Sequence, residues 1–149
     1  MFFKILEMHS VDKKKNPSAR ATCLNCMDGR VQLPVLNWIH EQYGIDCVDI
    51  ITEAGMDGVL ALQDNIDEII RSIKISIDIN KSERIFIVGH YDCRGNSVDE
   101  KTHREHIIKS AKRLRTHWPK IEVIGLWVDD QWRPDICYKS LKLELKTEG

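Results

Sequence analysis

Short apolar runs alternate with longer amphipathic stretches along most of the chain. Runs typical of buried strands lie at 21–25, 47–51, 85–88 and 123–127. Between them, apolar residues at helical spacing predict helices over about 33–43 and 58–77, and a third, highly charged helix over about 101–117. The second of these helices has its apolar face on Leu62, Ile66, Ile69, Ile70, Ile73 and Ile77. Strands that alternate with helices predict a three-layer α/β/α domain with a mostly parallel central sheet of about four to five strands.

The chain divides into a polar leader and one longer region. Residues 1–19 end in a Lys/Asn/Pro/Ser stretch, which predicts an N-terminal arm. Residues 20–149 contain all the predicted strands and helices and no internal repeat, so we expect a single domain there. A chain of 149 residues is long enough to bury a hydrophobic core.

Composition excludes several classes of function and suggests a compartment. The formal net charge is −1, so no basic field would favour nucleic acid as a partner. No apolar stretch approaches the length that spans a membrane. The first ten residues are too short and too interrupted by charge for a signal peptide. Five cysteines, an odd number, then favour reduced thiols and a cytoplasmic location.

Two short motifs contain the candidate chemistry. Cys26-Met-Asp-Gly-Arg30 follows the first predicted strand, and His90-Tyr-Asp-Cys93 follows the third. In open α/β sheets, ligands bind outside the carboxyl ends of the strands, so we expect both motifs at the same edge of the sheet. Two thiolates and one imidazole are a ligand set that Zn²⁺ prefers, and three protein ligands leave one coordination position open. Asp28 and Arg30 place a charged pair within reach of that position.

Each motif also has a simpler interpretation. The two cysteines and His90 could be core residues, and Asp28 and Arg30 could be a turn aspartate and a surface arginine. Cys23 adds a further alternative, because with Cys26, His90 and Cys93 it could complete a closed structural zinc site or, with Cys26, a redox dithiol. Positions 23 and 26 leave opposite faces of one strand, however, which favours Cys23 as a core residue.

The remaining histidines, cysteines and tryptophans give weaker indications. His103 and His106 are one helical turn apart and could share a metal, but the charge of their helix favours a solvated face. We expect packing roles for Cys47 and Cys137, and core or subunit-contact roles for Trp38, Trp127 and Trp132. The segment 127–132 could also cover the site.

The motifs, taken in order, resemble those of the β-class carbonic anhydrases, in a short and divergent form. The resemblance rests on Cys26–Arg30, Glu53-Ala54-Gly55 and Gly89–Cys93. It implies that Cys26, His90 and Cys93 bind Zn²⁺ and that the protein reversibly hydrates carbon dioxide to bicarbonate through zinc-bound hydroxide. It also implies that Asp28 orients the hydroxide, that Arg30 positions Asp28, and that Gly55 lies in a substrate-binding loop beside the metal.

The resemblance further implies a homodimer or a higher homo-oligomer. Two departures from the family pattern bear on the substrate: Thr52-Glu53 replaces the usual Arg-Asn, and Arg94 interrupts a glycine-rich stretch. One alternative is therefore a related zinc hydrolase acting on carbonyl sulfide or carbon disulfide. Another is a non-catalytic zinc-binding protein of the same fold, in which Cys23 or Asp28 occupies the fourth zinc position.

Overall fold

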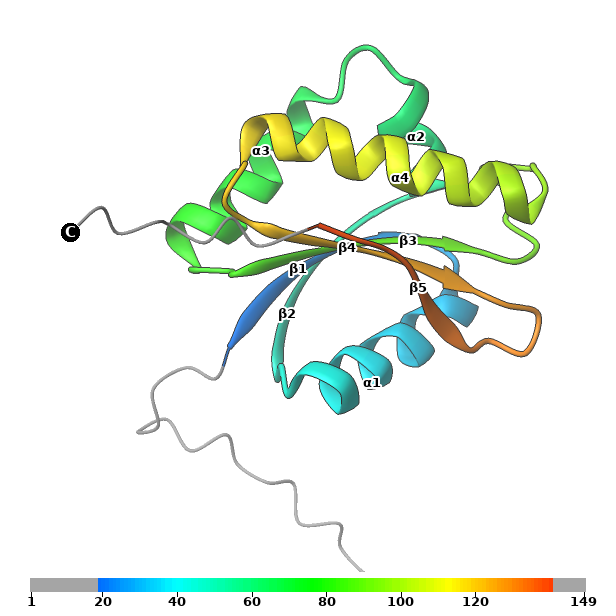
Figure 1. The fold of residues 1–149 in the computed structure, drawn as a ribbon, viewed down its shortest axis with the longest axis horizontal. Helices are drawn as coiled ribbons and strands as arrows, with labels where there is room; N and C mark the ends of the chain where they lie inside the picture. Colours follow the sequence, from blue (N-terminus) through cyan, green and yellow to red (C-terminus); the bar gives the residue numbers. More distant parts are fainter. Residues whose placement is uncertain (1–18, 141–149) are drawn as a thin grey trace, which may run out of the picture.

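A five-stranded sheet lies at the centre of the computed structural model, which describes residues 19–140 (Figure 1). Its strands, in the order β2-β1-β3-β4-β5, are β1 (Arg20–Cys26), β2 (Cys47–Glu53), β3 (Arg84–His90), β4 (Glu122–Val128) and β5 (Pro134–Lys139). The first four are parallel, and β5 pairs antiparallel with β4 at one edge. The mostly parallel α/β fold predicted from the sequence is confirmed.

Helices cover both faces of this sheet and give the three predicted layers. They are α1 (Gln32–Tyr43), α2 (Met56–Leu62), α3 (Asp67–Lys74) and α4 (Glu100–His117), with a 3₁₀ turn η1 (Gly29–Val31) and a π-helical turn η2 (Ile75–Ile79). Helix α1 packs on one face, and α2, α3 and α4 pack on the other (Figure 1). In β3, Phe86 and Val88 join the core under α1, whereas Ile85 and Ile87 join the opposite core. This alternation is that of a central strand buried on both faces.

The predicted helix over residues 58–77 is wrong as a single element. Helix α2 ends at Leu62, and α3 begins only at Asp67. Arg113 of α4 donates to the carbonyl oxygens of Leu60, Gln63 and Asp64 at 2.6–2.9 Å, which holds the chain in a turn there. The apolar residues keep a helical spacing across this break, so the pattern did not reveal it.

Strand β5 is not among the four strands that the sequence predicts individually. It begins at Pro134, and its residues are exposed or half-buried. A strand with one exposed edge tolerates proline and polar residues, so it lacks the apolar run that identifies the central strands. The predicted arm, residues 1–19, lies outside the described residues except for Ala19.

The strand order decides where the two motifs meet. After β1 the chain passes to β2 on one side, and it then returns to β3 on the other side of β1. The carboxyl ends of β1 and β3 are therefore neighbours at the point where the topology reverses, the usual ligand site of such sheets. Within residues 19–140, no helix is long and apolar enough to cross a membrane.

Candidate metal centre

The three predicted metal ligands lie together at the carboxyl ends of two adjacent strands. Cys26 is the last residue of β1, His90 is the last residue of β3, and Cys93 lies in the loop that follows. Their ligand atoms all lie within 4.8 Å of one another, and all three residues are buried. They are the one such group of histidine, cysteine and acidic residues found between residues 19 and 140.

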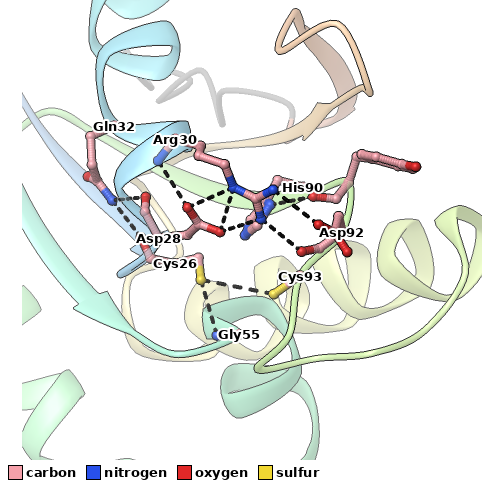
Figure 2. Close-up of polar contacts among 9 residues, drawn as sticks. Cys26, Asp28, Arg30, Gln32, Gly55, His90, Asp92 and Cys93 are labelled. Carbon is pink, nitrogen blue, oxygen red and sulfur yellow. Dashed lines mark hydrogen bonds and ion pairs between the residues drawn. The ribbon is translucent and has the colours of Figure 1, made fainter.

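The spacing of the two sulfurs suits a tetrahedral metal ion. The Sγ atoms of Cys26 and Cys93 are 3.9 Å apart (Figure 2). Two Zn–S bonds of about 2.3 Å at a tetrahedral angle would place the sulfurs about 3.8 Å apart. The backbone therefore already holds the sulfurs at a separation that Zn²⁺ can bridge.

The imidazole of His90 presents one free nitrogen to this group. Its Nδ1 lies 2.7 Å from the carbonyl oxygen of Tyr91, which assigns the hydrogen to Nδ1 as the donor. Its Nε2 is buried and has no hydrogen-bond partner among the described residues. A buried polar atom without a partner is costly, whereas a metal ion would satisfy this lone pair. The donor set therefore fits a zinc ion.

The hydrogen bond between the cysteine sulfurs moves their pKa values in opposite directions. This contact, together with the His90 side chain and the backbone N–H of Gly55, outweighs burial and lowers the pKa of Cys26 far below that of an ordinary thiol. The same contact, together with burial, raises the pKa of Cys93. Burial lowers the pKa of His90, but Cys26 and the Tyr91 carbonyl outweigh it and raise that pKa. Cys26 is thus held as a thiolate, the form that binds metals.

Asp28 and Arg30 form a two-pronged ion pair beside the ligands. The Arg30 side chain donates from Nε and Nη2 to both carboxylate oxygens of Asp28 at 2.7–3.2 Å, and the Arg30 backbone N–H donates to Oδ1 at 2.9 Å. These contacts lower the pKa of Asp28 to about 2 and raise that of Arg30. The Asp28 carboxylate is paired with Arg30 and is not a member of the ligand group. It therefore does not occupy the fourth metal position in this structure.

Arg30 also contacts Asp92, which was not predicted to belong to the site, and Trp132, the last residue of the segment 127–132. Its Nη1 donates to Oδ2 of Asp92 at 3.0 Å, and its Nη2 donates to the Asp92 carbonyl oxygen at 3.1 Å (Figure 2). The Trp132 ring lies 4.8 Å from the guanidinium carbon and 6.1 Å from the His90 ring. Asp92 stands inside the second motif, and this was the available indication of its role. Trp132 comes from the β4–β5 connection, which places the end of segment 127–132 beside the site.

An open cleft of about 690 Å³ reaches Cys26 and the pair of Asp28 and Arg30. Its lining includes Cys26, Asp28, Arg30, Ala54 and Arg94. The exposed Arg94, which interrupts a stretch expected to be glycine-rich, therefore lies at this cleft. Glu53 is also exposed and lies outside this lining; its backbone carbonyl accepts from the N–H of Met27 at 3.1 Å.

Gly55 contacts a cysteine sulfur directly. Its backbone N–H donates to Sγ of Cys26 at 3.4 Å, and the residue is buried. The Gln32 side chain donates to the carbonyl oxygens of Cys26 and Asp28 at 2.7 and 3.0 Å. Hydrogen bonds from Gly55 and Gln32 therefore hold Cys26, at the end of β1, and the turn that follows it.

The alternatives for Cys23 and the helical histidines are decided by burial. Cys23 is 1% exposed, lies in the core beneath α1 and stands outside the ligand group; burial raises its pKa to about 12. The core role predicted for it is confirmed. The solvated face predicted for His103 and His106 is wrong, because His103 is 1% exposed and His106 is half-buried. His103 shares the buried stripe of α4 with Ile107 and Ala111, and that spacing could have revealed it.

Comparisons with known proteins identify the family and the fold of this chain. A family model described as "Putative carbonic anhydrase" matches residues 16–137, whereas no curated protein matches the chain. Among solved structures, tetrameric β-carbonic anhydrases of Sordaria macrospora are similar, with 14% identity, a TM-score of 0.57, and coverage of 83% of this chain and 84% of theirs.

Two further solved structures are similar to a comparable degree. A carbonic anhydrase of Glaciozyma antarctica has 14% identity, a TM-score of 0.57, and coverage of 85% of this chain and 87% of its own. A β-carbonic anhydrase of Aspergillus fumigatus has 15% identity, a TM-score of 0.52, and coverage of 89% and 95%. At these identities the likeness shows a shared fold.

Proposed function

The chain belongs to a carbonic anhydrase family, and from that premise we propose that it reversibly hydrates carbon dioxide to bicarbonate at a zinc ion held by Cys26, His90 and Cys93. The observation that carries the proposal is the ligand group itself: two sulfurs 3.9 Å apart beside a buried imidazole nitrogen that has no other partner among the described residues. When bound, zinc would lower the pKa of a coordinated water to near 7 and so supply hydroxide at neutral pH.

Asp28 and Arg30 supply the orientation that this reaction needs. An ionised carboxylate accepts a hydrogen bond from a water molecule beside it and so fixes the direction of that water's lone pair. With a pKa of about 2, Asp28 stays ionised at every pH at which the reaction is useful. Arg30 holds the carboxylate in place through its two-pronged contact, and Asp92 and Trp132 hold Arg30.

The direct test is stopped-flow carbon dioxide hydration by zinc-loaded protein at pH 7 and at pH 8.5. We expect rapid turnover that is lost when zinc is removed by a chelator and restored when zinc is added back. Zinc-loaded protein with no rate above buffer at either pH would contradict the proposal. Activity on carbonyl sulfide or carbon disulfide would then identify the related hydrolase, and inactivity on all three substrates would identify a non-catalytic zinc protein.

We also propose a cytoplasmic location for the protein. All five cysteines lie within the described residues and none forms a disulfide. Thiols persist in reducing compartments, which supports a cytoplasmic location. A fluorescent fusion that accumulates outside the cytoplasm would contradict this location.

A further inference from the structure

A buried acid–histidine pair lies between α2 and α4, and the proposed chemistry does not use it. Asp57 and His103 are each 1% exposed, and Nδ1 of His103 lies 2.5 Å from Oδ2 of Asp57. A buried carboxylate is costly unless it is paired and hydrogen-bonded. The packing of two helices therefore does not by itself explain why this pair is buried here.

The pair is joined to the loop that carries Cys93. Asn96, three residues after Cys93, is 8% exposed, and its Nδ2 donates to Oδ1 of Asp57 at 3.1 Å. The same amide nitrogen donates to Nδ1 of His106 at 2.9 Å. The His103 Nδ1 hydrogen is directed to Asp57, so this nitrogen is not an acceptor for Asn96. The two hydrogens of the Asn96 amide are accepted by Asp57 and His106. The loop is thus fastened to α2 and α4 by one side chain.

Close backbone contact locks the same loop against the segment before α2. A Cβ atom added at Gly95 would lie 2.5 Å from the Ala54 carbonyl carbon and from the Gly55 nitrogen. One added at Gly55, which has a φ of 63°, would lie 2.4 Å from the Gly95 carbonyl carbon. Only glycine allows the two backbones to approach this closely. Side chains and backbone therefore fix the loop at two successive positions.

The segment from Gly55 to Asp57 also reaches the other two ligands. The backbone N–H of Gly55 donates to Sγ of Cys26 at 3.4 Å. The Asp57 carboxylate lies against Gly89, the residue before His90, so closely that a Cβ there would be 2.9 Å from Oδ2. Each ligand, or the backbone that carries it, is therefore in contact with this segment or with a residue bound to it.

From these contacts we propose that Asp57, Asn96 and His103 are positioning residues of the metal centre, which hold Cys93 at bridging distance from Cys26 before a metal ion arrives. The proposal rests on the metal site proposed above. Two further contacts hold the network: Ser110 Oγ donates to the Asp57 carbonyl oxygen at 3.1 Å, and the Trp127 ring lies 5.2 Å from the His103 ring. Gly55, which is predicted to lie in a substrate-binding loop, also donates its backbone N–H to a ligand sulfur.

The sharpest test removes the loop's anchor and leaves the buried pair intact. In Asn96→Ala the pair of Asp57 and His103 remains, so we expect the protein to fold. The matched control is Ser97→Ala, at the next position of the same loop, where the side chain is exposed. Zinc affinity is measured at 25 °C by competition with a chromogenic chelator, and ligand geometry by the thiolate charge-transfer band of the Co²⁺-loaded protein.

We expect Asn96→Ala to bind zinc about 10-fold more weakly, with an altered Co²⁺ band. This is the lower end of the range for an outer partner of a metal ligand, because the Asn96 side chain acts on Cys93 through the loop and not by direct contact. Ser97→Ala should match the wild type. Asp57→Asn, if it folds, should also weaken zinc binding. A folded Asn96→Ala protein whose zinc affinity lies within twofold of the wild type would overturn the proposal.

Two measurements distinguish the positioning role from a purely structural role and from the proposed function. A purely structural network would lower the melting temperature of Asn96→Ala and leave its zinc affinity at 25 °C unchanged, which overturns the positioning role. Wild-type protein that binds zinc but does not hydrate carbon dioxide would contradict the proposed function. A weakened Asn96→Ala affinity in that same protein would still support the positioning role.

Discussion

At the scale of single residues, most polar atoms of the site have hydrogen-bond partners in the described part of the chain, and one atom of a proposed metal ligand does not. His90 Nδ1 is occupied by the Tyr91 carbonyl, and Asp28 is occupied by Arg30, but His90 Nε2 has no hydrogen-bond partner among residues 19–140. His90 thus presents a nitrogen without a partner among these residues beside two sulfurs. This asymmetry leads to three predictions about individual side chains.

Cys93→Ser should reduce zinc binding by more than about 100-fold, because it replaces a thiolate ligand and not merely one of its outer partners, whose loss costs about 10–100-fold. Metal content after dialysis, measured by mass spectrometry, tests this. The control is Cys137→Ser, which changes a thiol outside the ligand group. Full zinc retention by Cys93→Ser would remove Cys93 from the proposed ligand set.

Asp28→Asn should keep its zinc and lose about 100-fold in the rate of carbon dioxide hydration, in the range that a positioned acid or base contributes. With its oxygen directed at Arg30, the amide would present donors where the carboxylate accepts. Hydration kinetics and zinc content are measured on the same sample. A rate equal to that of the wild type would exclude the orienting role of Asp28.

The Asp28 carboxyl should titrate near pH 2 in the wild type and close to its ordinary value of 3.8 in Arg30→Ala. Because its folded pKa is lowered, the stability that the pair contributes is present above pH 3.8 and is lost as the pH falls through about 2. NMR titration of the carboxyl carbon gives both values. An Asp28 pKa that does not rise in Arg30→Ala would contradict the assigned cause.

At the scale of elements, α4 does more than cover the sheet. Its buried stripe supplies His103 to the network around Asp57, and Arg113 holds the turn between α2 and α3. The orientation of α2 matters because the segment that enters it contacts Cys26 through Gly55. Helix α4 therefore affects the site indirectly, through its contacts with α2.

Arg113→Ala should lower the free energy of unfolding by about 1–3 kcal/mol, since three backbone carbonyls lose their donor. Urea denaturation followed by circular dichroism measures it. Lys112→Ala, at an exposed neighbouring position of α4, is the matched control and should stay within about 0.5 kcal/mol of the wild type. Equal stability of both variants would show that the turn does not depend on Arg113.

At the scale of the whole molecule, the sheet has an open edge. Strand β2 is one of the two outer strands, and it has no second strand partner among residues 19–140. Ile50 of β2 and Ile75 of η2, 42% and 43% exposed, line one shallow groove at this edge. An uncovered strand edge with exposed apolar residues favours association with another chain.

We therefore expect the protein to be a homodimer or a larger homo-oligomer, as the family resemblance also implies. Light scattering after size-exclusion chromatography should give a mass of at least twice the 17.3 kDa of one chain. A monomer mass maintained across a hundredfold range of concentration would contradict this expectation.

Much of the fold and of the candidate ligand set could be predicted from the sequence, because both depend on local patterns. Short apolar runs identified β1 to β4, apolar residues at helical spacing identified α1, and a charge-rich stretch identified α4. The residue types at 26, 90 and 93 indicated zinc chemistry. The break between α2 and α3 escaped prediction because its cause, Arg113, lies 49–53 residues away. The role of Asp92 escaped for the same reason, since it is defined by a contact with Arg30, 62 residues away.

The sequence by itself thus determined the four parallel strands, the helices α1 and α4, and which side chains could bind a metal, since strand, helix and ligand preferences belong to short segments. Only the tertiary structure decided that β1 and β3 are neighbours, and hence that sulfurs 67 positions apart lie 3.9 Å from each other. It also decided that Asp57 and His103 meet in the interior and not in solvent. Such contacts depend on strand order and helix packing, which place residues side by side whatever their separation along the chain.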